Sequence, residues 1–176
     1  MRMGLRPRLL VGDLDSLGPD LQAWLNGTGT PVLAYPAEKD YIDAHLAIDK
    51  AIGLQPQEIL LLGCIGTRLD HTLANVGLLL RCHRAGIPCR LLDENNEVIL
   101  VSDETVRLSG KPGDIISLLP LSEQVTGITT RGLKYPLDEG TLSQGESRGV
   151  SNEFLGPVVS VRVGTGYLLV IRSKSS

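Results

Sequence analysis

The sequence predicts an α/β domain followed by an all-β domain, with the change near residues 93–97. Up to residue 92, apolar runs of strand length alternate with segments of helical periodicity, which is typical of a parallel sheet with crossover helices. After residue 97 the helical periodicity ends, and short apolar runs recur between Gly, Pro, Asn and Asp, which favours a β-sandwich or barrel. We therefore expect two domains, at residues 1–93 and 97–176.

The α/β part contains four apolar runs that we expect to form strands, at residues 9–10, 32–35, 59–62 and 89–92. A helix is expected over residues 44–52, because five residues there follow the spacing of one helical face. These residues are Ala44, Ala47, Ile48, Ala51 and Ile52. Gly53 should end this helix, since glycine tolerates a positive φ.

A second helix is expected over residues 70–85. Gly86 and Pro88 follow it and should stop it. The residues expected along one side of this helix are Leu69, Leu73, Val76, Leu80 and His83.

The all-β part contains six short apolar runs. They lie at residues 98–101, 106–108, 115–121, 125–130, 158–163 and 167–171. Turn-forming residues separate the runs, so we expect each of them to be a strand.

Composition and charge limit the classes of function. The 176 residues are 42% hydrophobic and carry 17 basic and 20 acidic side chains, a net charge of −3, which argues against a broad nucleic-acid-binding surface. The three cysteines form no C-x-x-C pair and fit reduced thiols in a cytosol. The sequence contains neither a signal peptide nor an apolar run near the roughly 20 residues that span a bilayer. We expect a soluble cytoplasmic protein that binds neither nucleic acid nor membranes.

Three acidic loops follow three of the expected strands. Ligands of an open parallel sheet bind outside the carboxyl ends of the strands, so these loops should meet at one edge. Together they carry five carboxylates, one Lys, one Arg and one His. Because carboxylates hold hard divalent cations and Lys and Arg hold phosphate, the combination predicts metal-assisted nucleotide chemistry.

The first loop carries Asp13 and Asp15, two positions apart. On an extended segment their side chains point to the same side, so both could approach one cation. The alternative is that Asp15 or Ser16 caps a helix that begins near Pro19.

The second loop carries Lys39, Asp40 and Asp43 just before the first expected helix. Asp43 suits the N-cap of that helix, where a negative charge complements the macrodipole. Lys39 favours a phosphate site instead, because helix N-termini also bind phosphates.

The third loop carries Arg68, Asp70 and His71 after Gly63 and Gly66. The glycines let the backbone approach a phosphate, whose oxygens then accept backbone N–H groups. The loop contains neither a Walker A ending nor a G-x-G-x-x-G fingerprint. Zinc-protease spacing of the histidines and a G-x-S-x-G elbow are also absent from the sequence.

The all-β part offers Tyr135, Ser151 and Asn152 as a polar group with an aromatic ring. Ser and Asn supply both donors and acceptors, which suit a heteroaromatic ring with an amino group. Tyr135 could stack on such a ring, especially a cationic one. The alternative is a surface turn beside a strand pair.

Five motifs in order resemble the thiamine pyrophosphokinase family, from about residue 7 to the last expected strand. They are Gly-Asp-Leu-Asp-Ser at 12–16, Glu-Lys-Asp-Tyr-Ile-Asp at 38–43, Gly-Thr-Arg-Leu-Asp-His-Thr-Leu-Ala-Asn at 66–75, Gly-Leu-Lys-Tyr-Pro-Leu at 132–137 and Gly-Val-Ser-Asn-Glu at 149–153. The resemblance implies an N-terminal Rossmann-like catalytic domain, a C-terminal β-sandwich that binds thiamine, and a homodimer. It implies transfer of pyrophosphate from ATP to thiamine, which gives thiamine diphosphate and AMP.

The resemblance also implies a role for each site residue. Mg²⁺ would be held by Asp13, Asp15 and Asp40. ATP and its phosphates would contact Ser16, Lys39, Arg68 and His71, and thiamine would contact Tyr135, Ser151 and Asn152. The catalytic carboxylates would be Asp13, Asp15, Asp40, Asp43 and Asp70, with the proton acceptor among the last three.

The sequence departs from the family at three points. Members of the family have a further strand and glycine-containing loop before the first acidic motif, and we expect this chain to lack that segment. Ile42 stands where Thr is usual, and Thr67 where a second Gly is usual. Two other functions remain open, a metal-dependent nucleotide or phosphate-ester hydrolase and a module that binds thiamine or nucleotide without catalysis.

Overall fold

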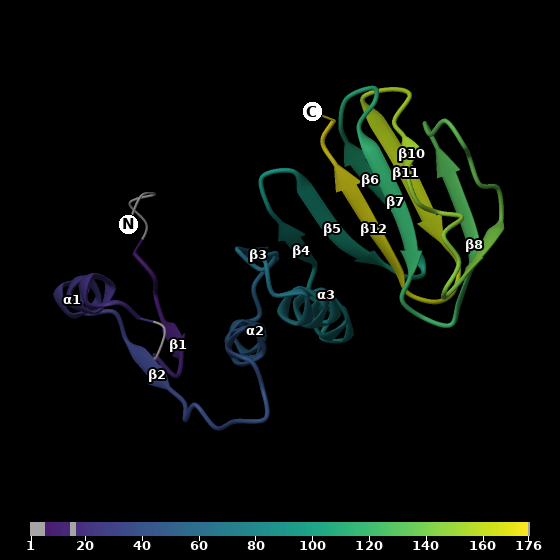
Figure 1. Cartoon of the computed structure of the whole chain (residues 1–176). Helices are drawn as coiled ribbons and strands as arrows, with labels where there is room; N and C mark the ends of the chain where they lie inside the picture. The colour runs from purple at the N-terminus through teal and green to yellow at the C-terminus, as the bar shows by residue number, and fades with distance from the viewer. Residues whose placement is uncertain (1–5, 15–16, 176) are drawn as a thin grey trace. The chain divides into compact units, whose positions relative to one another are not determined.

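The computed structural model describes residues 6–14 and 17–175 of the chain (Figure 1). The chain divides into two compact units, Met1–Pro56 and Gln57–Ser176, and each is treated by itself. Within the described residues, the helices are too short or too polar to cross a bilayer.

The first unit is a β-α-β arrangement followed by a helix. Its elements are β1 (Leu10–Gly12), α1 (Pro19–Thr28), β2 (Val32–Ala34) and α2 (Asp43–Gly53). Strands β1 and β2 pair in parallel, and α1 makes the crossover between them. Helix α2 packs on β1. Both expected strands and the helix expected over 44–52 are confirmed.

The ends of the two helices differ in part from what the sequence predicts. Helix α1 starts with Pro19 and ends before Gly29, whose φ of 61° is the left-handed conformation that terminates helices. Asp15 and Ser16 lie outside the described residues, so the idea that one of them caps this helix is untested. The expectation that Asp43 is the N-cap of α2 is wrong, because Ile42 takes that place and Asp43 is the first helical residue. The positive φ after α2, of 48°, falls at Gln55, not at Gly53.

The second unit begins with another parallel pair joined by a helix. Strands β3 (Ile59–Leu62) and β4 (Cys89–Leu92) are parallel, and α3 (Leu69–Arg84) connects them. Helix α3 packs on β4 and on the following strand β5 (Asn96–Val101). Gly86, at φ 71°, ends the helical segment as expected.

The face that helix α3 buries is not the apolar side named from the sequence. The buried residues are Asn75, Leu78, Leu79 and Cys82, whereas Leu69 and Leu73 are 67% and 62% exposed. The helix is apolar on two sides, so the periodicity alone could not decide which side meets the sheet. Packing against β4 and β5 selects the face that contains Leu79.

The remaining strands build two sheets that lie face to face (Figure 1). They are β6 (Glu104–Ser109), β7 (Ile115–Pro120), β8 (Gln124–Arg131), β9 (Gly140–Ser143), β10 (Asn152–Glu153), β11 (Val158–Val163) and β12 (Leu168–Ser173). One sheet has the order β10-β7-β12-β5-β4-β3 and the other the order β6-β11-β8-β9. All six apolar runs are confirmed as strands, whereas β9 and β10, which are short and partly polar, were not predicted.

The parallel and antiparallel strands share one sheet. Strand β4 pairs in parallel with β3 and in antiparallel fashion with β5. The turn between β4 and β5 is held by Asp93, whose Oδ1 accepts the N–H groups of Asn95 and Asn96 at 2.8 and 2.6 Å. The domain change expected at residues 93–97 falls on this turn, and the sheet continues across it. The exact domain limits therefore remain a prediction.

The main core lies between the two sheets. Alternate residues of the strands point into it, which is the period of two expected for strands with one buried face. Its fully buried members include Ile116, Leu118, Ile128, Leu142 and Phe154, each no more than 2% exposed. This core fixes the segments that carry the β-sheet candidate residues.

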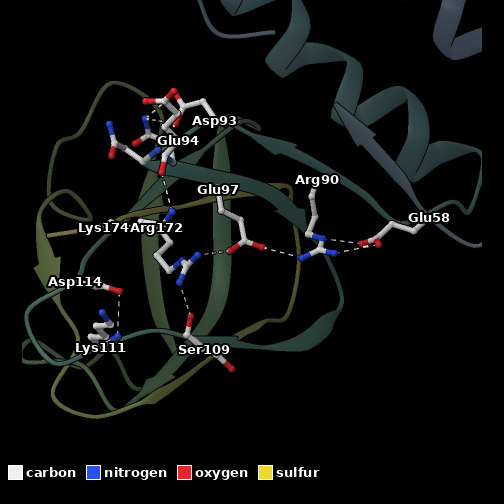
Figure 2. Close-up of polar contacts among 12 residues, drawn as sticks. Glu58, Arg90, Asp93, Glu94, Glu97, Ser109, Lys111, Asp114, Arg172 and Lys174 are labelled. Atoms are coloured by element: carbon white, nitrogen blue, oxygen red, sulfur yellow. Dashed lines mark hydrogen bonds and ion pairs between the residues drawn. The ribbon is translucent and has the colours of Figure 1, made fainter. Parts of the chain in front are cut away.

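A chain of ion pairs links the strands at one side of this unit (Figure 2). Arg90 contacts Glu58 through Nε and Nη2, at 2.7 and 3.0 Å, and reaches Glu97 through Nη1 at 3.3 Å. Glu97 also pairs with Arg172 at 3.2 Å, and Arg172 donates to the carbonyl of Ser109 at 2.6 Å. The chain ties β4, β5, β12 and β6 together, so these groups have a structural role.

Asp114 should make the stability of this unit depend on acid pH. Its carboxylate, in a residue only 4% exposed, accepts the N–H groups of Ser175 and Lys111 at 3.1 and 3.0 Å. These bonds, that of Ser175 most strongly, lower the pKa of Asp114 from its usual 3.8. Its contribution to stability is thus complete above pH 3.8 and disappears as the pH falls through the lowered pKa.

The variant Asp114→Asn tests this expectation. The amide replaces an acceptor by a donor, so we expect a loss of about 1–3 kcal/mol at pH 7. Thermal unfolding measured from neutral to strongly acidic pH should show the gap between variant and wild type closing as the solution becomes acidic. A gap of constant size at every pH would contradict the role given to Asp114.

Candidate functional site

An acidic cluster with a lysine at its centre lies in the first unit. Lys39 Nζ is 2.8 Å from Asp13 Oδ2 and 2.9 Å from Asp43 Oδ1. Asp13 directly follows β1, Lys39 lies in the loop after β2, and Asp43 begins α2. Because β1 and β2 are parallel neighbours, their carboxyl ends bring the two loops together.

Lys39 is paired with both carboxylates of this cluster. Hydrogen bonding to Asp13, and then to Asp43, raises the pKa of Lys39 above its usual value. The lysine side chain is only 13% exposed, so its ammonium group is held between the carboxylates. Asp43 Oδ1 is buried and has no hydrogen-bond partner of good geometry among the described residues, although it faces Lys39. Lys39 therefore links the carboxylates of Asp13 and Asp43.

Gly12 allows Asp43 to lie against the backbone of β1. A Cβ atom at Gly12 would lie 3.1 Å from both Cγ and Oδ2 of Asp43, and the φ of Gly12 is 152°. A side chain at this position would therefore push Asp43 away and also strain the backbone.

Replacing Gly12 by Ala should destabilise the protein by about 1–3 kcal/mol, because the methyl group crowds Asp43 and the φ is unfavourable. Gly27→Ala is the matched control, since a Cβ there meets nothing within 4 Å and Gly27 lies in helix α1. The control should stabilise by up to about 1 kcal/mol, because Ala favours helix. Chemical denaturation of both variants measures the contrast, and equal effects of the same sign would refute it.

The other acidic candidates of this unit are placed differently. Asp40 is exposed, next to Lys39 in the chain. Asp15 and Ser16 lie outside the described residues. Within residues 6–14 and 17–175, no three His, Cys, Asp or Glu side chains converge into a metal site. The predicted ligand set of Asp13, Asp15 and Asp40 therefore stays a prediction, and the structure brings Asp43 rather than Asp40 next to Asp13 through Lys39.

In the second unit, the glycine-containing loop between β3 and α3 lines a cavity of about 240 Å³. Arg68 and His71 are among its lining residues. Arg68 pairs with Asp70 at 3.3 Å through Nε and 2.6 Å through Nη2, and the two side chains are 69% and 64% exposed. The pairing lowers the pKa of Asp70 and raises that of Arg68. An exposed ion pair contributes little to stability, so an anionic ligand could replace Asp70 at small cost. Arg68 is therefore accessible to such a ligand.

Two further polar residues shape this loop and were missed as site candidates. Thr72 Oγ1 accepts the N–H of Gly66 at 3.2 Å, and Asn75 Nδ2 donates to the carbonyl of Cys64 at 2.9 Å. Asn75 is 7% exposed, and its Oδ1 has no hydrogen-bond partner among the described residues. Asn75 lies in the motif at 66–75, but its burial could not be predicted, because the periodicity does not decide which side of the helix is covered.

The β-sheet candidates lie on two neighbouring segments of the second unit. Tyr135 is 63% exposed, whereas Asn152 is 9% exposed and lies in β10. Asn152 is hydrogen-bonded to the backbone of Tyr135 through both its oxygen and its nitrogen. Ser151 is exposed, has a φ of 61° and donates its N–H to Ser117 Oγ at 3.2 Å. The structure thus brings these three residues together in one region.

The fold and these clusters define a mixed α/β protein with acidic and glycine-containing loops, followed by a β-rich part with an exposed aromatic ring. Residues 1–91 match the family model described as thiamin pyrophosphokinase, catalytic domain. Residues 103–168 match the one described as thiamin pyrophosphokinase, vitamin B1 binding domain. The chain belongs to the thiamin pyrophosphokinase family, as its sequence motifs indicate.

Individual relatives agree with this assignment. The chain is 32% identical to the thiamine pyrophosphokinase of Bacillus subtilis (strain 168), over 97% of this chain and 80% of the relative. The crystal structure of thiamine pyrophosphokinase from Bacillus subtilis superimposes with a TM-score of 0.90 at 30% identity, covering 99% of this chain and 82% of the other. The thiamin pyrophosphokinase from Geobacillus thermodenitrificans gives 0.86 at 33% identity, with 99% and 81% covered.

Proposed function

We propose that this chain is a thiamine pyrophosphokinase, which transfers the pyrophosphoryl group of ATP to the hydroxyethyl oxygen of thiamine. The products are thiamine diphosphate and AMP. The observation that carries the proposal is the match of both family domains, in order, to a chain whose first unit holds the Asp13–Lys39–Asp43 cluster.

The phosphate-binding role falls to basic side chains of the loops. Such a transfer depends mainly on alignment and on neutralising charge. Lys39 is protonated and held in place by two carboxylates, and Arg68 is exposed beside a glycine-containing loop. These two residues, with His71 and Ser16, would bind the phosphates and the nucleotide.

The acidic cluster fits a hard divalent cation such as Mg²⁺. Asp13 and Asp43 both pair with Lys39, so carboxylates already gather beside the loops that follow β1 and β2. Carboxylate oxygens are the ligands that Mg²⁺ prefers. Asp13, Asp15 and Asp40 would hold the ion, which would neutralise phosphate charge and make the β-phosphorus more open to attack.

A carboxylate must also accept the proton of the thiamine hydroxyl group. Asp70 is a weak acceptor, because its pairing with Arg68 lowers its pKa. Asp43 is paired with Lys39 and lies against Gly12, while Asp40 is exposed and adjacent in the chain to Lys39. We therefore propose that the base is Asp40 or Asp43 rather than Asp70.

Thiamine would bind at the β-rich part. The exposed ring of Tyr135 offers a face on which the cationic thiazolium or the pyrimidine could stack. Ser151, exposed beside it, offers a hydroxyl group to the polar edge of the vitamin.

The proposal also covers the domain limits, the oligomeric state and the location of the chain. The parallel pairs β1–β2 and β3–β4 support a Rossmann-like N-terminal domain. We propose domains at residues 1–93 and 97–176, a homodimer, and a cytoplasmic location, to which the free cysteines are suited.

Product analysis tests the activity. The full chain is incubated with ATP, Mg²⁺ and thiamine, and nucleotides and thiamine compounds are separated by chromatography. We expect AMP and thiamine diphosphate in equal amounts, and no AMP when thiamine is omitted. Nucleotide breakdown without thiamine would instead indicate a hydrolase, and thiamine binding without product would indicate a module without catalysis. Either result would overturn the proposal.

A further inference from the structure

The side chain of Asn152 is fully engaged with the backbone of its own β-rich part. Its Oδ1 accepts the N–H of Tyr135 at 3.0 Å and that of Glu153 at 2.9 Å. Its Nδ2 donates to the carbonyl of Tyr135 at 2.7 Å. The backbone N–H and the carbonyl of Tyr135 are therefore both hydrogen-bonded to the side-chain amide of Asn152, which lies 17 positions away in the chain.

Asn152 is also poorly placed to meet a ligand. It is 9% exposed, whereas the ring of Tyr135 belongs to a residue that is 63% exposed. An amide that already makes three hydrogen bonds has at most one N–H left to offer. The hydrogen-bonding groups of the Asn152 side chain are therefore used almost entirely within the protein.

The loop that carries Tyr135 is fixed at its other points as well. Leu137 N–H donates to Thr130 Oγ1 at 2.8 Å, and Leu137 in turn accepts the N–H of Thr130 at 2.9 Å. Lys134 N–H donates to the carbonyl of Glu153 at 3.0 Å, and the side chains of Lys134 and Glu153 pair at 3.0 Å. With the ends fixed in this way, the Asn152 amide determines the backbone at the aromatic residue itself.

We infer that Asn152 is a positioning residue, which holds the backbone of Tyr135 so that the exposed ring is presented to thiamine, and that it does not itself contact the vitamin. The inference rests on the proposed function and changes the role that the family resemblance implies for Asn152. Ordering the loop before binding lowers the entropy that the ligand must otherwise supply.

A double-mutant cycle separates positioning from direct contact. Asn152→Asp keeps the two acceptor bonds and loses the donor to the carbonyl of Tyr135, while Tyr135→Ala removes the ring. We expect each single variant to raise the KM for thiamine by about tenfold, with the KM for ATP unchanged. If Asn152 acts through Tyr135, the double variant should be no worse than Tyr135→Ala alone. Effects that multiply to about a hundredfold would show direct contact with thiamine and overturn the inference.

A matched control and a binding measurement complete the test. Asn95→Asp makes the same chemical change at an exposed site in the β4–β5 turn and should leave both KM values unaltered. The chain has a single tryptophan, Trp24, so a Tyr135→Trp reporter in a Trp24→Phe background gives one fluorescent signal. We expect thiamine to quench it, and Asn152→Asp to shift the midpoint to about tenfold higher thiamine. An unchanged midpoint in a folded variant would refute the positioning role.

Turnover and fluorescence quenching test the proposed activity and the positioning role of Asn152 separately. Absence of turnover by the wild-type chain would defeat the proposed activity. The positioning role of Asn152 would still predict that thiamine quenches the Tyr135→Trp fluorescence and that Asn152→Asp shifts the midpoint. Failure of that result would contradict the positioning role alone.

Discussion

The variant Asp13→Asn should form thiamine diphosphate at least about 100-fold more slowly than the wild-type chain, a loss of the size seen when one charge-stabilising group is removed from an active site. Asp13 is bonded to Lys39 at 2.8 Å and is a proposed ligand of Mg²⁺. The neutral amide would weaken the metal site. It would also remove the ion pair between Asp13 and Lys39. Initial rates at saturating ATP, Mg²⁺ and thiamine measure the effect.

The control for this variant is Asp20→Asn, the same change at an exposed position in the first turn of α1. It should retain at least half of the activity, because Asp20 lies outside the cluster. Asp40→Asn should lose activity to the same extent as Asp13→Asn. A folded Asp13→Asn or Asp40→Asn protein with wild-type rates would remove that residue from the proposed metal site.

The variant Phe154→Ala should destabilise the protein by about 3–5 kcal/mol, the range for removing a large buried aromatic ring. Phe154 is 1% exposed, and its ring lies so close to Gly110 that a Cβ there would be 2.9 Å from Cε1. The collapse of such a site is limited, because Phe154 is also fixed by backbone bonds to Asp114 and Gly113. Urea denaturation at neutral pH measures the loss.

Leu155→Ala is the matched control for the ring. Leu155 is the next residue along the chain and is 63% exposed, so its truncation should change the stability by less than about 0.5 kcal/mol. Equal losses in the two variants would contradict the placement of the Phe154 ring in the core between the sheets.

The strands were predictable where the chain has a run of apolar residues, and the short, partly polar strands β9 and β10 were not. The run at 158–163 alternates exposed and buried residues, and this period of two indicates a strand. Strand β10 is only two residues long and contains Asn152, and its existence depends on pairing with Ile116 and Ile115 of β7. A contact of this kind is tertiary, and no local pattern contains it. The buried face of α3 could not be predicted for a related reason, since the sheet and not the helix decides which apolar side is covered.

The meeting of the first two acidic loops was predictable, whereas the atoms that contact one another were not. Acidic and basic residues after neighbouring parallel strands were expected to meet, and Asp13 and Lys39 do meet. Which carboxylate of the second loop joins them depends on where α2 begins, and that start places Asp43 against Gly12. Likewise, the donors and acceptors of Asn152 suggested a ligand, but the partner that takes them is the backbone of Tyr135.

The fate of labelled phosphorus shows whether this chain moves the β- and γ-phosphates of ATP together onto thiamine. The wild-type chain is given Mg²⁺ and thiamine with ATP labelled at the γ position, and in a parallel reaction at the α position. We expect γ label in thiamine diphosphate and α label in AMP, with neither label in ADP. Release of γ label as inorganic phosphate, or α label recovered in ADP, would contradict it.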